Sequence, residues 1–412
     1  MVINVFEEED GGGVAVAEEQ EREEDLPSPQ AEGAENKEEE MAFETAKKQV
    51  IAEGLELMAQ NNDPGGENPK EYHTTENHLK PLEERKKRIV KALRMSSEQA
   101  GVAEMAIVWH DGVVNETTID PENIIAMVGR LGGAEEGDPP AGAEGNEAQS
   151  GRGLEASMRR QGVFSEEQIA NAVLSVKATY ARAEFGKKFS AEERHAQIIA
   201  KNPELAALVA TLAKEGIDSG PYFFQPHLKR MFAEAKANGT KVAPEILTMA
   251  LSDLGGAGME SKEVMAREGD NEARELFKNV KKPETLQRLL RDDSEESASD
   301  RAKVAKALLG FVAMQPGFIA WRWIDYLDNK EMAKDTGSID PAHETDLDAE
   351  SDHFKTNALG AVERQKMLRS DYESAKASLG ERHAFESLAR SVGYEYTPVV
   401  KEEKQAAYSR LT

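Results

Sequence analysis

The sequence predicts a mainly helical chain. From residue 154 onward, start and stop signals for helices follow one another, and no alternating apolar pattern reaches convincing strand length. The hydrophobic content of 39% and the aromatic content of 6% are low for 412 residues, so part of the chain is expected not to fold. We therefore predict a helical core over about 154–390, preceded by a long acidic arm.

The predicted arm covers residues 1–80 and is expected to be disordered. Residues 1–150 carry 35 acidic and 13 basic side chains, whereas the rest of the chain carries 42 and 38. Residues 7–41 combine a block of like charge with Gly, Pro and Gln, and residues 61–79 are rich in turn formers. Such segments hold too few large apolar residues for burial to offset chain entropy.

A small α/β module is predicted over 82–132. Its first stretch, EERKKRIVKALRM, places apolar residues near one face of a helix. Two apolar segments, 106–110 and 113–119, then flank Asp111-Gly112, which is a strong hairpin signal. The composition of residues 133–153, rich in Gly, Pro and Ala, predicts a linker.

The core is predicted to consist of consecutive helices with their own caps. Ser165 and Gln168 form a capping-box pattern, Asn202 precedes Pro203 in a typical helix start, and Gly216 ends that helix. A tail is expected over 391–412. Further helices are predicted over 227–237, 245–254, 271–279, 284–291, 301–314, 317–329, 353–369 and 371–390.

Composition and motifs argue against an enzyme. The chain has no cysteine, which excludes disulfides, thiolate catalysis and cysteine-ligated metals. Its eight histidines show no His-x-x-x-His spacing, and neither a phosphate-binding glycine loop nor a Gly-x-Ser-x-Gly motif occurs. The acidic run 346–352 lacks the glycine and glutamate of a calcium loop and predicts a solvated linker. We expect no metal, no cofactor and no catalytic residue.

No membrane segment is predicted either. No run approaches 18 apolar residues, and the N-terminus has no basic segment followed by an apolar one. The protein is therefore expected to stay in the cytoplasm where it is made.

The aromatic segment PGFIAWRWIDYLD contains the first candidate binding residue. Trp321 and Asp325 are four residues apart and share a helix face, so the carboxylate would lie against an aromatic wall and need a cationic partner. Arg288 and Arg291 in KKPETLQRLLRDD are the candidate partners. The alternative interpretation is an ordinary core helix.

Six segments in order resemble the coat protein core of flexible filamentous plant viruses, most closely the potyvirus family. They are SEEQIANAVLSVKATYA (165–181), FAEAKANGTKVAP (232–244), FKNVKKPETLQRLL (277–290), WRWIDYLD (321–328), HFKTNALGAVERQKML (353–368) and GERHAFESL (380–388). The resemblance implies a helical core that polymerises around single-stranded RNA.

In that family a serine, an arginine and an aspartate line the RNA groove. The resemblance places the aspartate at Asp325 and the serine position at Lys241, where a phosphate contact would be charged instead of neutral. The arginine position aligns with Gln287, and Arg288 follows one residue later. The implied RNA-binding residues are therefore Lys241, Arg288 and Asp325, with Arg291 as an alternative cation.

These observations predict a viral coat or nucleocapsid protein. Its expected partners are single-stranded RNA and copies of itself, and its expected locations are the virion and the host cytoplasm. An alternative is an acidic assembly or scaffolding factor that binds protein partners through its arm and its helical domain. A hydrolase with a dispersed site is a third hypothesis.

Overall fold

The computed structural model describes residues 29–65, 70–112, 146–179, 190–217, 226–280, 289–290 and 294–393. The regular structure within these ranges is helical, with no strand, which confirms the helical prediction for the core from residue 154 onward. By its internal contacts the chain divides into two units, Met1–Ala42 and Phe43–Thr412. The described part of the first unit is the beginning of helix α1 (Pro29–Asn61), and everything below concerns the second unit.

The second unit begins within α1 and contains a series of further helices. They are the π-helix η1 (Thr75–Leu79), α2 (Lys80–Leu93), α3 (Ser97–Trp109), α5 (Asn146–Gln161), α6 (Glu166–Ala178), α7 (Ser190–Lys201), α8 (Pro203–Lys214), α9 (Pro226–Asn238), α10 (Pro244–Gly255), the 3-10 helix η2 (Gly256–Met259), α11 (Lys262–Val280), α13 (Glu295–Asp335), the 3-10 helix η3 (Pro341–His343), α14 (Glu344–Ala349), α15 (Phe354–Leu379) and α16 (Glu381–Ser391).

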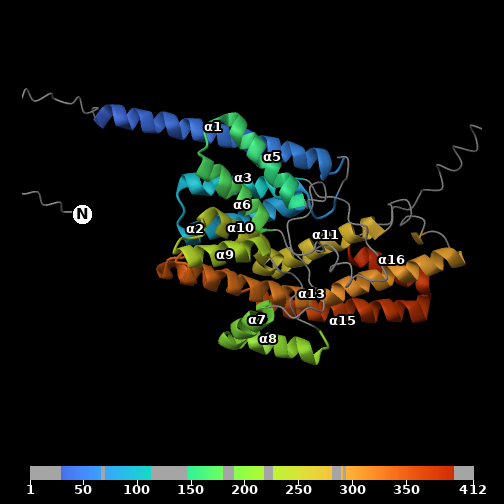
Figure 1. Ribbon diagram of the computed structural model, residues 1–412. Helices are drawn as coiled ribbons and strands as arrows, with labels where there is room; N and C mark the ends of the chain where they lie inside the picture. Colours follow the sequence, from blue (N-terminus) through green and yellow to red (C-terminus); the bar gives the residue numbers. More distant parts are fainter. Residues whose placement is uncertain are drawn as a thin grey trace, which may run out of the picture. The chain divides into compact units, whose positions relative to one another are not determined.

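Three apolar cores hold these helices together. One joins α1 from Phe43 onward with α2, α3, α5 and α6; a second joins α7 to α10 with α13 and α15; a third joins α11, α13, α15 and α16. Helix α10 belongs to the first two cores through Met249 and Leu247. Helix α13 belongs to the last two through Ile324 and Leu308, and α15 runs alongside it (Figure 1).

Several predicted helix boundaries are confirmed. The Ser165 hydroxyl accepts a hydrogen bond from the backbone N–H of Gln168, whose side chain accepts one from the N–H of Ser165. Helix α8 starts at Pro203, although the amide of Asn202 donates to the Ile198 carbonyl and does not cap the helix. Gly216 has a φ of +70°, a conformation that ends a helix readily only at glycine.

The two helices predicted over 301–314 and 317–329 are one helix, α13, which continues through Pro316. Proline removes one backbone hydrogen bond there, but the helix is buried against several neighbours that stabilise it. Part of α13 is apolar and long enough to cross a membrane by composition alone. Since 61% of that window is buried within the protein, the structure matches the core helix of a globular protein equally well.

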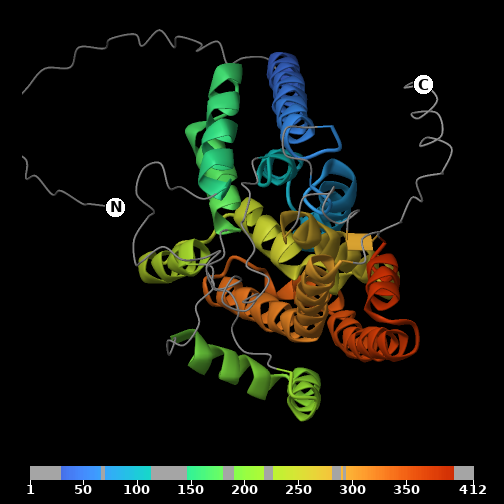
Figure 2. The same cartoon turned by 90° about the vertical axis from the view of Figure 1, so that its right-hand side faces the viewer.

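At the C-terminal end, the boundary between the last two helices lies at Gly380 and not at residue 370. Gly380 has a φ of +88°, so it lets the chain turn back and α16 packs against both α15 and α13 (Figure 2). Of the predicted tail 391–412, residues beyond 393 lie outside the described residues.

The predicted disorder of residues 1–80 is wrong where the structure describes the second unit. Phe43, Ala46 and Val50 lie on one face of α1 and are buried, and the Trp109 indole donates a hydrogen bond of 2.9 Å to the Val50 carbonyl. Leu79 in η1 is also buried. The apolar residues are few, but their helical spacing lets them all reach one core.

The predicted hairpin in the 82–132 module is also wrong. Residues 106–109 form the last turn of α3, while 113–119 lie outside the described residues. Ser96 and Gln99 form a capping box that starts α3. The helix is buried on every side and is apolar all round, so its sequence shows no alternation of apolar and polar residues with the helical period. Residues 146–153 of the predicted linker belong to α5.

Candidate functional site

Asp325 lies where the sequence places it, on the buried face of the long helix α13. Its side chain and that of Trp321 are about 2% exposed, which confirms that the two share a buried face. Asp328 follows one turn later and is equally buried. The Asn329 amide donates to Asp325 Oδ2 at 3.0 Å, so three polar side chains of α13 converge at this point.

Lys229 of α9 is a cationic partner of these carboxylates. Its Nζ lies 2.6 Å from Asp328 Oδ2, 3.5 Å from Asp325 Oδ1 and 2.8 Å from Asn329 Oδ1. The sequence predicted an arginine for Asp325, but the partner that the structure describes is a lysine. The predicted candidates Arg288 and Arg291, together with Gln287, lie outside the described residues.

Arg194 of α7 is a second cation at this place. Its Nε donates a hydrogen bond to Asp328 Oδ1, and its side chain is 33% exposed. Within the described residues its buried Nη2 has no hydrogen-bond partner. We call Lys229, Arg194, Asp325 and Asp328 the α13 cluster. It holds an arginine whose orientation is fixed by a buried aspartate.

The charges of the α13 cluster are nearly balanced. Burial raises the pKa of Asp325, and the neighbouring Asp328 charge raises it further against the attraction of Lys229. Burial also acts to raise the pKa of Asp328, but Lys229 and Arg194 outweigh it and lower that pKa. Burial lowers the pKa of the adjacent His195, which favours its neutral form.

Lys241 does not join Asp325. It is exposed on the loop before α10 and lies beside Gly337, just beyond the end of α13. Gly337 follows Asp325 by 12 positions in the chain, so roughly 18 Å of helix separates the two at 1.5 Å per residue. Lys241 and Asp325, which were predicted to bind the same RNA strand, therefore lie at different places along α13 and do not form one site.

The surroundings of Lys241 are acidic. The residue lines a cavity of about 920 Å³ between α3, α6, α10 and the loop after α13. The described lining includes four carboxylates, Glu98, Glu167, Glu245 and Asp340. Burial raises the pKa of Glu245, and the charges of Glu167 and Glu98 add to this effect. A phosphate would meet these charges, so the cavity suits a cationic group better than RNA.

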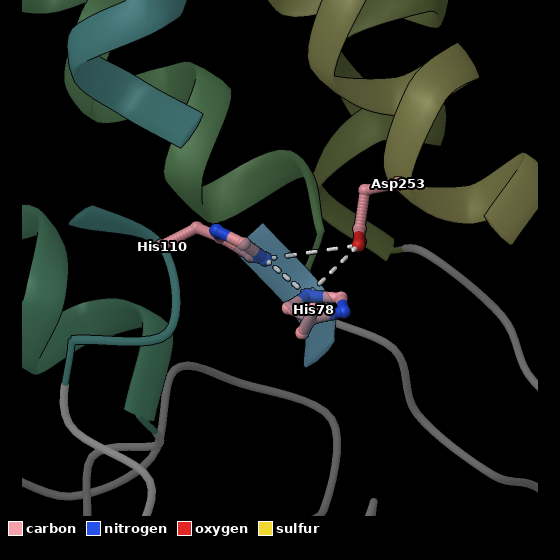
Figure 3. Close-up of side chains that lie close together, drawn as sticks. All are labelled: His78, His110 and Asp253. Atoms are coloured by element: carbon pink, nitrogen blue, oxygen red, sulfur yellow. Dashed lines mark hydrogen bonds and ion pairs between the residues drawn. The ribbon is translucent and has the colours of Figure 1, made fainter. Parts of the chain in front are cut away.

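A second group of buried ionisable residues escaped the sequence analysis. His78, His110 and Asp253 place one ligand atom each within 4.8 Å of one another (Figure 3). Asp111 lies against both imidazoles. These residues lie in η1, just after α3 and in α10, and they span 175 positions of the chain. Because no two lie at helical spacing, local patterns could not reveal them.

The chain matches no protein-family model, and no curated protein or solved structure resembles it at a significant level.

Proposed function

We propose that this protein is a viral coat or nucleocapsid protein that binds single-stranded RNA with its helical core and assembles with copies of itself. The observation that carries the proposal is the Arg194–Asp328 pair in the α13 cluster. The buried carboxylate fixes the guanidinium, while about a third of the arginine side chain is exposed to solvent.

A fixed guanidinium suits a phosphate. Its planar array of donors matches phosphate oxygens, and little side-chain freedom is lost on binding when a carboxylate already orients it. A coat that packages RNA of any sequence needs such contacts to the backbone and needs no readout of base edges. The sequence predicted this role for Arg288 and Asp325. We assign it to Arg194 and Asp328.

The tryptophans of α13 do not support base stacking. Trp321 and Trp323 are buried, and the Trp323 ring is stacked parallel to the Phe354 ring at a centroid distance of 6.1 Å. Because these rings pack inside the core, RNA would be held through its phosphates, and binding should depend strongly on salt.

The proposal is tested with RNA binding by Arg194→Gln. The full chain is expressed in bacteria, and we measure the RNA that is protected from nuclease, the filaments seen by electron microscopy and the affinity for an oligonucleotide at several salt concentrations. Loss of one phosphate contact should weaken binding for every sequence and reduce the salt slope by about one. Thermal unfolding reports whether the variant still folds.

Lys201→Gln is the matched control. Lys201 also joins α7 to α13, through an ion pair with Glu331 on the surface. The substitution therefore removes one positive charge from the same helix as Arg194→Gln does. It should change the affinity only slightly. Wild-type protein that stays monomeric and free of RNA, or equal losses in the two variants, would contradict the proposal.

The acidic cavity favours a second candidate, an acidic assembly or scaffolding factor that binds basic segments of protein partners. Glu167→Gln separates the two functions, because Glu167 lines the cavity and lies outside the α13 cluster. A scaffolding factor that binds through the cavity would lose affinity for its partners, whereas a coat protein would bind RNA as the wild type does.

A further inference from the structure

The four residues His78, His110, Asp111 and Asp253, here called the histidine cluster, meet where three segments converge. His78 lies in η1, His110 and Asp111 follow the last turn of α3, and Asp253 lies near the end of α10. Both imidazoles are buried, at 5% and 2% exposure of the side chain, and both carboxylates are 18% exposed. Figure 3 shows His78, His110 and Asp253 pointing toward one another.

Three of the potential ligand atoms, one each from His78, His110 and Asp253, lie within 4.8 Å of one another, and Asp111 lies against the two imidazoles. The two Nε2 atoms are 3.1 Å apart, and each lies 3.0 Å from Asp111 Oδ2. Asp253 Oδ1 lies 3.9 Å from His78 Nε2 and 3.7 Å from His110 Nε2. Ligands at about 2.0 Å from a tetrahedral zinc ion would be about 3.3 Å from one another, which lies within the range of these separations from the imidazoles.

The Ile107 carbonyl orients the His110 ring so that Nε2 faces the cluster. Its Nδ1 lies 2.6 Å from this carbonyl, which can only accept, so Nδ1 carries a proton; Nε2 lies 3.0 Å from the Asp111 carboxylate, where a metal ion would replace the second proton. This is the arrangement that orients a metal-binding histidine. The Asn62 amide also donates to the Asp111 carbonyl at 2.8 Å and holds the turn after α3.

The charge of the histidine cluster fits a divalent cation. Two carboxylates converge on two imidazoles, and within the described part of the chain no lysine or arginine side chain contacts either carboxylate. Two neutral imidazoles and two carboxylates carry a charge of about −2, which one divalent ion neutralises.

We propose that His78, His110, Asp111 and Asp253 bind a divalent transition-metal ion of the zinc class. The ion would tie η1 and the end of α3 to α10, because its ligands come from all three places. His78 Nδ1 is buried with no hydrogen-bond partner in the described residues. This imidazole therefore lacks the hydrogen bond that usually orients a metal-binding histidine. The affinity should therefore be tenfold to a hundredfold weaker than at a fully supported site, following the effect of losing such a partner.

The test uses the full chain, freed of metal with a chelator and titrated with ZnCl₂. We expect one zinc per chain by elemental analysis and calorimetry, and a higher melting temperature at equimolar zinc. CoCl₂ should give the visible absorption bands of tetrahedral cobalt. The variants His110→Gln and Asp253→Asn should each bind zinc at least tenfold more weakly.

His353→Gln is the matched control, because His353 is exposed and lies outside the cluster. It should bind zinc like the wild type. The wild-type titration and cobalt spectrum need no variant, so they stand even if a substitution weakens folding. The proposal is overturned if zinc leaves the melting temperature unchanged, if cobalt shows octahedral bands only, or if His110→Gln binds zinc as tightly as the wild type. RNA binding plays no part in these outcomes.

Discussion

The two buried groups of histidine and aspartate in this protein differ in how their charge is balanced. In the α13 cluster, Lys229 and Arg194 contact the carboxylates directly, and His195 stays beside them. In the histidine cluster, the described residues provide imidazoles but no permanent cation. Among the described residues, the first is therefore a salt-bridge network balanced by side-chain cations, whereas the second takes its counter-charge from a proton or a metal ion. Similar residue types thus support different functions.

The largest expected effect comes from opening the α13 cluster. Asp328→Ala leaves Lys229 buried with its shortest ion pair removed, so we expect a loss of about 3–5 kcal/mol in the free energy of unfolding. Urea denaturation measures this loss. Glu331→Ala, on the same helix but in a surface pair with Lys201, should cost about 0–1 kcal/mol. Equal effects in the two variants would show that the buried pair is not special.

The next effect concerns Glu275 and His73, a charged pair next to the histidine cluster. Glu275 accepts backbone hydrogen bonds from residues 71–73 and lies 2.6 Å from His73 Nδ1. Burial would raise the pKa of Glu275, but His73 and these hydrogen bonds lower it to about 2. Burial would lower the pKa of His73, but Glu275 raises it to about 9.

The contribution of this pair to the free energy of unfolding should be largest between pH 4.5 and 6.5, the ordinary pKa values of the two groups. It should fall by about 3 kcal/mol as pH drops toward 2, where Glu275 is protonated, and again as pH rises through 9, where His73 loses its proton. Urea unfolding at a series of pH values tests this. Glu275→Gln should remove most of the loss of stability at both low and high pH. Glu386→Gln, which alters an exposed pair with Arg390, should leave the pH dependence unchanged.

A smaller effect distinguishes the two clusters through zinc. Free zinc at a hundredfold excess over its Kd should stabilise the wild type by about 2.7 kcal/mol, seen as a higher melting temperature. Asp253→Asn should abolish most of this gain. In chelator the same variant should also lose stability, because Asp111 and Asp253 raise the pKa of His110 to about 9 against burial, and the protonated imidazole then loses one carboxylate partner. Zinc titration of both proteins separates this loss from the gain that zinc supplies.

The smallest effect comes from helix caps. Ser96 caps α3, which leads into the histidine cluster, and Ser165 caps α6, which does not. Each serine-to-alanine change should cost about 1 kcal/mol in unfolding experiments. Only Ser96→Ala should also weaken zinc binding, since it loosens the helix that positions His110. Equal zinc affinity in both variants would show that the α3 start is uncoupled from the cluster.

The helical class of the core, several of its boundaries and the burial of Asp325 were predictable from sequence. Caps such as Ser165 and breaks such as Gly216 act over a few residues, so a local pattern suffices to place them. The period of the aromatic segment likewise placed Trp321 and Asp325 on one buried face.

Only the tertiary structure decided the partners and the less regular segments. Lys229 meets Asp328 across 99 positions, and His78 meets Asp253 across 175, distances over which sequence carries no geometric signal. Residues 43–61 and 106–109 were misjudged because packing against neighbouring helices, and not local composition, makes them helical. Local preference therefore determined where many helices begin and end, whereas long-range burial decided which charges meet.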